Sequence, residues 1–250
     1  MEFPERFEPS EYVKWHHFTN PDDVDLSSKL DNLLVQLTKE SKDDINLLNE
    51  IFEYFFEYSR KEYKTTNNGY VKYKLPKNVD FKTITSIYNK LWRSYKNNKL
   101  FIPFDDIKGK ITDLIRTEIV GDTLTACRFL AERFKIENIH DKKLYTKCKK
   151  RIKSISFEPE MKMASGYFAY HILITFSDNI IIEVQIFSSI IKKWRELSHT
   201  LYEITRVNQL NPEFGSKESR LISLGHLFHL AECEIERLQQ EFNNISQKNS

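Results

Sequence analysis

Residues 166–187 read GYFAYHILITFSDNIIIEVQIF, and they carry the strongest β-strand pattern in the chain. Two runs rich in β-branched and aromatic residues, 170–176 and 179–187, are joined by a short polar turn. Such runs around a tight turn predict an antiparallel β-hairpin. In the second strand Glu183 and Gln185 are two residues apart, so they share one face. A solvated outer face is the ordinary explanation for a single strand glutamate, so any functional interpretation depends on what surrounds it.

The rest of the chain shows helical periodicity on both sides of the hairpin, with one further strand. Residues 111–120 alternate with period two and lead through a turn at Gly121 into a helix, which predicts a strand, turn and helix. The sequence therefore predicts an α+β fold, in which a central mixed β-sheet is flanked by N- and C-terminal helices. Helices are predicted over residues 25–63, 81–95, 124–134, 190–206 and 219–242.

Composition limits the classes of protein that fit this chain. Its 250 residues are 40% hydrophobic, which suffices for one globular domain, and the formal net charge of +2 excludes a globally basic nucleic-acid binder. The three cysteines show neither metal-ligand nor redox spacing, and the N-terminus lacks the features of a signal peptide. No long apolar run predicts a membrane span, so a cytoplasmic protein is expected. Only six glycines occur, and none forms a glycine-rich phosphate loop.

Five short segments together carry a more specific signal than any one of them alone. In this order and at these separations they resemble the synthetase domain of the RelA/SpoT family, which includes the small alarmone synthetases. The resemblance runs over residues 81–202, close to half of the chain. The segments are Lys82-x3-Ser86-x3-Lys90, Asp113-Leu-Ile, Gly166-Tyr167 with His171, Glu183-Val-Gln185-Ile, and Trp194-Arg-Glu-Leu-Ser-His199-Thr-Leu-Tyr202.

The resemblance implies both an architecture and an activity. The architecture is the nucleotidyltransferase-like mixed sheet of that family, in a single domain over residues 1–250. Residues 1–65 would form an N-terminal helical extension, and residues 217–250 a C-terminal helix and tail. Family enzymes transfer the β,γ-pyrophosphate of ATP to the ribose 3′-hydroxyl of GDP or GTP, which makes (p)ppGpp in the stringent response. This chain would then be an ATP-dependent pyrophosphokinase that uses Mg²⁺ and a guanine nucleotide.

The same resemblance suggests roles for individual residues, and their chemistry suits phosphoryl transfer. Such transfer needs a carboxylate-held metal, cations around the phosphates and an aligned hydroxyl. As helix residues at i, i+4 and i+8, Lys82, Ser86 and Lys90 would share one face. The predicted catalytic and metal-binding residues are Asp113 and Glu183. The predicted ATP-binding residues are Lys82, Ser86, Lys90 and Arg116, and the predicted acceptor-binding residues are Tyr167, His171 and Gln185. Solvated lysines, a core tyrosine and a hydrogen-bonded histidine are the ordinary structural alternatives.

Several departures from the family pattern fall close to these residues. Asp80 stands where an arginine is expected, and Phe187-Ser188 replaces an Arg-Thr pair. The family pattern D-x-x-G-x-R appears here as Asp113-Leu-Ile-Arg116-Thr-Glu118, so the arginine comes two residues earlier. Because strand side chains alternate, Arg116 would keep the same face with a shift of roughly 6.6 Å. Further changes are Ser165 for asparagine and Phe168-Ala169 for Arg-Ser.

Two other functions remain open from the sequence. Residues Lys142 to Lys153 contain seven cations and a tyrosine, and basic clusters with aromatic side chains hold single-stranded nucleic acid. A toxin that pyrophosphorylates the 3′ end of tRNA, with an antitoxin protein as partner, is one alternative. A nucleotide-binding or protein-interaction module without catalysis is the other. The nucleotide synthetase ranks first, because Tyr167 can stack on an acceptor base and a lysine run alone is poor evidence for RNA.

Overall fold

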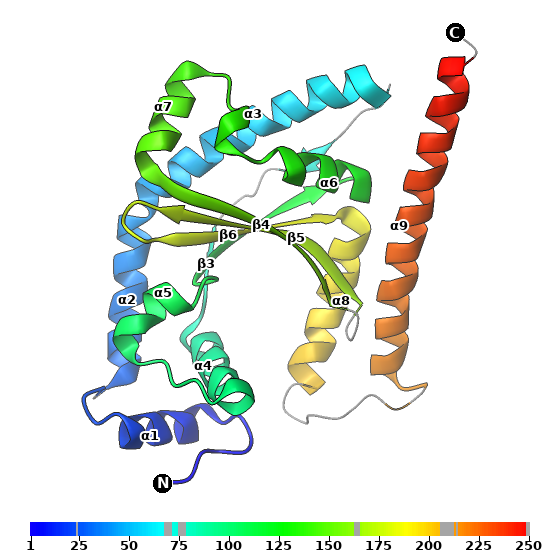
Figure 1. The fold of residues 1–250 in the computed structure, drawn as a ribbon. Coiled ribbons are helices and arrows are strands. Elements are labelled where there is room, and N and C mark those ends of the chain that lie inside the picture. The colour runs from blue at the N-terminus through cyan, green and yellow to red at the C-terminus, as the bar shows by residue number, and fades with distance from the viewer. Residues whose placement is uncertain are drawn as a thin grey trace.

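The computed structural model has a central sheet with helices on both of its faces (Figure 1). Figure 1 shows α3, α6 and α7 on one side of the sheet and α4, α5 and α8 on the other, with α9 standing alongside. The predicted α+β architecture with flanking helices is confirmed. The structure describes residues 1–23, 25–67, 72–74, 79–162, 166–205, 213 and 215–248.

The described helices occupy both ends of the chain and the connections between strands. None of them is long and apolar enough to cross a membrane. The α-helices are α1 (Pro9–Thr19), α2 (Leu26–Glu40), α3 (Lys42–Asn67), α4 (Ile84–Asn98), α5 (Ile107–Lys110), α6 (Leu124–Arg133), α7 (Lys142–Arg151), α8 (Ser189–Thr205) and α9 (Lys217–Lys248). Short 3-10 turns at Phe104–Asp106 and Ile136–Asn138 precede α5 and α7.

The strands form one mixed sheet. They are β1 (Tyr73–Lys74), β2 (Asp80–Phe81), β3 (Ile115–Gly121), β4 (Ile152–Lys162), β5 (Tyr167–Phe176) and β6 (Ile181–Ser188). The order is β1-β3-β6-β5-β4, and β2 also pairs with β3. β3 and β6 run parallel, and all other pairs are antiparallel. The predicted hairpin is therefore confirmed as β5 and β6.

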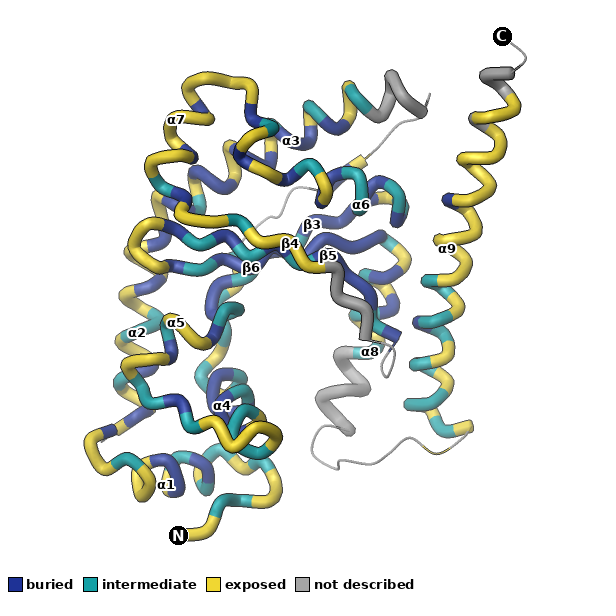
Figure 2. Tube along the Cα trace, viewed as in Figure 1, coloured by how far each residue is buried: buried dark blue, intermediate teal, exposed yellow. Residues whose placement is uncertain are grey.

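The two faces of the sheet differ because strand side chains alternate. On β6, Ile182 and Val184 are fully buried in the main hydrophobic core, together with helices α3, α6 and α7. The residues between them, Glu183 and Gln185, point to the other face. Parallel pairing sets Arg116 opposite Glu183, so this second face is polar across β3 and β6. In Figure 2 β3, β5 and β6 are mostly buried, whereas β4 at the edge of the sheet is mostly exposed.

Two expected elements differ in detail from the structure. The helix predicted from residue 81 begins at Ile84, because residues 80–81 pair with β3 as the short strand β2. Lys82 therefore lies before the helix, not on it, and the helical spacing predicted for Lys82, Ser86 and Lys90 is wrong at its first member. The strand predicted over residues 111–120 starts at Ile115 and leaves Asp113 in the turn before it.

Candidate functional site

Asp113 is held between two lysines. Its Oδ2 accepts a hydrogen bond of 2.7 Å from Lys82 Nζ, and its Oδ1 accepts one of 2.5 Å from Lys90 Nζ. The three side chains are largely covered, with exposed fractions of 18%, 10% and 33% for Asp113, Lys82 and Lys90. Burial raises the pKa of Asp113, but the charge of Lys90 and the two hydrogen bonds outweigh it and lower the pKa to about 2. Asp113 is therefore ionised over the physiological range.

Local strand pairing explains how these residues meet. Asp80 and Phe81 pair with Arg116 and Ile115, and the backbone N–H of Lys82 donates to the carbonyl of Leu114 at 2.9 Å. This pairing fixes Lys82 beside the turn that holds Asp113. The next residue, Thr83, is the N-cap of α4 and accepts from the N–H of Ser86.

Helix α4 then brings Lys90 to the same carboxylate, two turns after its start. Ser86, in the first turn, accepts a hydrogen bond of 2.9 Å from the hydroxyl of Thr83. Its side chain therefore belongs to the helix cap. Its role in ATP binding stays a prediction.

Glu183 is the centre of a second hydrogen-bonded group. Its Oε1 lies 2.8 Å from Nδ1 of His171, and its Oε2 accepts a hydrogen bond of 2.8 Å from Nε2 of Gln185. Nε2 of His171 lies 3.1 Å from the hydroxyl of Tyr167. These contacts form a chain when Nδ1–H of His171 donates to Glu183 and the Tyr167 hydroxyl donates to Nε2. Burial raises the pKa of Glu183, but its bonds to His171 and Gln185 lower it overall.

The two carboxylates lie close enough to influence each other. β3 and β6 are parallel neighbours, and the charge of Asp113 is one of the influences that raise the pKa of Glu183. Between them, Arg116 lies directly opposite Glu183 on one side and Asp80 on the other. Within the described residues no hydrogen bond or ion pair occupies the Arg116 guanidinium. Asp80, which stands where the family pattern has an arginine, therefore faces Arg116.

Comparison with solved structures places this arrangement in a known fold. A GTP pyrophosphokinase family protein from Streptococcus pneumoniae matches with a TM-score of 0.50 and 15% identity, covering 82% of this chain and 96% of that one. The chain has a RelA/SpoT-like synthetase fold. The small alarmone synthetase 2 of Bacillus subtilis gives a TM-score of 0.48 and 16% identity, over 85% of this chain and 98% of that one. Neither a protein-family model nor a curated protein sequence matches.

The structure adds charged residues that the sequence did not point to. Glu118, opposite Gln185 in register, forms ion pairs with Lys192 and Arg195 of α8. The Arg195 guanidinium also lies over the ring of Phe187 at 4.9 Å. The motif over residues 194–202 identified the helix. It gave no indication that Lys192 and Arg195 face the sheet, because that depends on how α8 packs.

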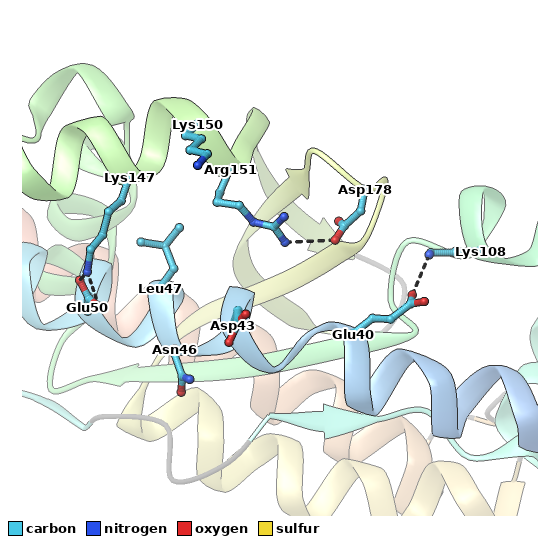
Figure 3. Close-up of a pocket in the computed structure, with 10 residues that line it drawn as sticks. All are labelled: Glu40, Asp43, Asn46, Leu47, Glu50, Lys108, Lys147, Lys150, Arg151 and Asp178. Atoms are coloured by element: carbon cyan, nitrogen blue, oxygen red, sulfur yellow. Dashed lines mark hydrogen bonds and ion pairs between the residues drawn. The ribbon is translucent and has the colours of Figure 1, made fainter.

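The basic segment from Lys142 to Lys153 lies away from the two carboxylates. It forms α7 and the first residues of β4, on the face of the sheet opposite to α4 and α8 (Figure 1). Several of its cations are also paired with acidic residues. Lys147 and Arg151 bond to Glu50 and Asp178 at the edge of a cavity of about 730 Å³ (Figure 3). A tRNA acceptor held by this segment would require a surface continuous with the site. The segment instead lies on the other face of the sheet.

The donor groups suit the Mg²⁺ that the family resemblance predicts. Mg²⁺ in phosphate-transfer sites commonly takes one or two carboxylates, and substrate phosphates and water complete its shell. Asp113 and Glu183 supply that number of carboxylates, and each oxygen keeps a second lone pair beside its present hydrogen bond. Among the described residues no cluster of three or more acidic, histidine or cysteine side chains forms a closed metal site. A Mg²⁺ ion bound here would therefore take phosphate oxygens and water as its further ligands.

The pairing of Asp113 leads to a testable pH dependence. Because its pKa in the folded protein is about 2, below the ordinary 3.8, ionised Asp113 stabilises the fold above about pH 4. That contribution, roughly 2 kcal/mol, is lost as the pH falls toward 2.

We expect Lys90→Met to raise the pKa of Asp113, since the charge of Lys90 is the largest influence that lowers it. Carboxyl carbon NMR titration measures this directly, and an unchanged pKa would contradict the ion pair.

Proposed function

We propose that this chain transfers the β,γ-pyrophosphate of ATP to the 3′-hydroxyl of a guanine nucleotide. One observation carries the proposal. On the polar face where β3 and β6 run parallel, the lysine-held Asp113 and the histidine-held Glu183 lie within electrostatic reach of each other. A carboxylate among cations suits a polyphosphate, and a carboxylate bonded to histidine suits a hydroxyl that loses its proton.

The donor nucleotide would bind at the Asp113 end. Lys82 and Lys90 present ammonium groups there, and Arg116 adds a guanidinium whose donors are not engaged by other described residues. Burial lowers the pKa of Lys82 more than its bond to Asp113 raises it, and the charges of Lys90 and Arg116 lower it further. An anionic phosphate within hydrogen-bonding distance would stabilise the charged form of each of these side chains. The triphosphate of ATP supplies that anion.

The transfer itself requires one bond to form and one to break. The 3′ oxygen of the acceptor forms a bond to the β-phosphorus of ATP. The bond from that phosphorus to the oxygen bridging to the α-phosphorus breaks, and AMP leaves. Glu183 accepts the hydroxyl proton, and the resulting acid stays bonded to His171 and Gln185. Mg²⁺ held by Asp113 and Glu183 would neutralise phosphate charge.

His171 and Gln185 would fix the position of Glu183. Each of them bonds to a different carboxylate oxygen, so the Glu183 side chain is held in one orientation. Tyr167 holds the other ring nitrogen of His171, and its side chain packs against the small buried cluster that contains Phe187. The hydroxyl of Tyr167 thus orients the histidine. Stacking of its ring on the acceptor base remains a prediction from the family resemblance.

A mononucleotide acceptor is favoured over tRNA by the position of the basic segment. The cations of α7 lie across the sheet from Glu183 and pair in part with α3. They are therefore poorly placed to hold an RNA whose 3′ end reaches Glu183. No specific contact in the described residues supports the tRNA alternative.

Labelled ATP and a set of acceptors test this function. Purified protein with Mg²⁺ and ATP labelled in the γ-phosphate is offered GDP, GTP, ATP and bulk tRNA in separate reactions. We expect label in the guanine nucleotides, and AMP formed in equal amount, because transfer of pyrophosphate leaves AMP behind. Label in tRNA alone would show that tRNA, and not a guanine nucleotide, is the acceptor. Label in no acceptor would refute the enzymatic function.

A further inference from the structure

The polar face of the sheet carries a second cationic group, at the end away from Asp113. Along β6 the residues that point to this face are Glu183, Gln185 and Phe187, spanning roughly 13 Å at 3.3 Å per residue. Lys82 and Lys90 lie near one end of this row. Lys192 and Arg195 of α8 reach the other end, where they pair with Glu118 and Arg195 covers Phe187.

This group carries more positive charge than its one carboxylate neutralises. Two cations share the single carboxylate of Glu118, whose side chain is 39% exposed. Arg195 has five N–H donors, and among the described residues its one polar contact is a long one of 3.5 Å to Glu118. Its side chain is only 20% exposed and is held against a buried phenylalanine. Among the described residues Arg195 is thus a guanidinium fixed in place, with most of its donors not engaged.

The same group lies beside two positions at which this sequence departs from the family pattern. The sequence has Glu118 where the family strand ends in arginine, and Phe187 where the family has arginine after Gln-Ile. In the structure Arg195 of α8 lies over Phe187 and bonds to Glu118. A cation of the following helix therefore lies beside both positions.

We propose that Lys192 and Arg195 bind the 5′-phosphates of the acceptor nucleotide. This inference rests on the proposed function, because that function places the 3′-hydroxyl of the acceptor at Glu183. In a nucleotide the 5′-phosphates lie on the other side of the ribose from the 3′-hydroxyl. A nucleotide whose hydroxyl points toward Asp113 therefore directs its 5′-phosphates toward the α8 end of the face. GDP and GTP carry the charge that this end can bind.

Binding measurements with GDP and guanosine test the inference without requiring catalysis. Arg195→Gln removes the charge but keeps a hydrogen-bonding side chain, and Lys193→Gln, on an exposed position of the same helix, is the matched control. By calorimetry, Arg195→Gln should bind GDP at least about tenfold more weakly than the control, because it loses a charge-assisted contact. Guanosine, which has no phosphate, should bind equally to both variants.

Glu118→Gln gives an effect in the opposite direction. Without the carboxylate, both cations become available, so this variant should bind GDP more tightly than the wild type. If Arg195 and Lys192 only neutralise Glu118, Arg195→Gln will match Lys193→Gln and Glu118→Gln will bind GDP no better, which overturns the inference. If Arg195→Gln weakens the binding of ATP alone, the inference is also overturned, because the cations would then bind the donor nucleotide.

The outcomes separate this inference from the proposed function. A wild-type protein that binds GDP through its phosphates but transfers nothing would refute the enzymatic function and leave the phosphate site standing. If GDP is pyrophosphorylated with the same KM for GDP by the wild type and by Arg195→Gln, the phosphate site is refuted and the enzymatic function stands.

Discussion

Replacing Glu183 by glutamine will lower kcat for pyrophosphate transfer by a factor of ~10²–10⁴, the range that a general base contributes. The change is nearly isosteric. The new side-chain oxygen can still accept the hydrogen bond from Gln185, and His171 can change tautomer to accept one from the new amide. The neutral amide, however, cannot take the proton of the acceptor hydroxyl.

The control for this variant is Glu137→Gln. Glu137 is 72% exposed and lies in the connection before α7, so its loss leaves the polar face of the sheet intact. Thermal unfolding of both variants would establish that the fold is retained. A Glu183→Gln variant with a tenth or more of the wild-type kcat would show that Glu183 is not the proton acceptor.

A methyl group added at Gly166 will destabilise the protein by more than 2 kcal/mol. Gly166 has φ of +70°, where a side chain costs about 1–2 kcal/mol. Its added Cβ would also lie 2.7 Å from the carbonyl oxygen of Ile222 and 3.2 Å from Cα of Gly225, both in α9. Contact with backbone cannot be relieved by rotating a side chain. We expect a lower urea midpoint and a displaced Tyr167, the next residue along the chain.

Variants at three other glycines distinguish the cost of the positive φ from the cost of the contact with α9. Gly215→Ala has φ of +81° with open space around it, and therefore measures the backbone strain alone. Gly225→Ala measures the contact, since its Cβ would lie 2.7 Å from the carbonyl oxygen of Gly166 and 2.8 Å from Cε2 of Trp194. Gly109→Ala has nothing within 4 Å and is the control. If Gly225→Ala is as stable as Gly109→Ala, α9 does not pack on the Gly166 turn.

The sequence predicted the parts of the fold that depend on local pattern. Alternating and β-branched runs identified β5, β6 and the turn between them, and helical spacing identified most helices. The strand β4 was missed because its sequence, IKSISFEPEMK, mixes charged residues with a proline and lies at an edge of the sheet. The two-residue strand β2 is too short to give any periodic signal, so Lys82 was assigned to the helix that follows it.

The candidate site was partly accessible from the sequence, through motifs and not through spacing. Asp113 and Glu183 are 70 positions apart, and only the parallel pairing of β3 with β6 brings the turn before β3 close to the strand of Glu183. No local pattern encodes that pairing, which the family resemblance alone suggested. The cations of α8 were missed for a related reason. Which face of a helix meets a sheet is set by packing between distant segments, and Lys192 and Arg195 look like ordinary helix charges in the sequence.

Following the β- and γ-phosphorus atoms of ATP separately distinguishes pyrophosphate transfer from transfer of a single phosphate. Wild-type protein is incubated with Mg²⁺, GDP and ATP labelled at either the β- or the γ-phosphate, and the labelled product is then identified. Pyrophosphate transfer at the Asp113 and Glu183 site predicts that both labels appear in the guanine nucleotide in equal amounts, while unlabelled AMP accumulates. Transfer of the γ-label alone, with ADP as the other product, would contradict the claim, as would the absence of either label from the acceptor.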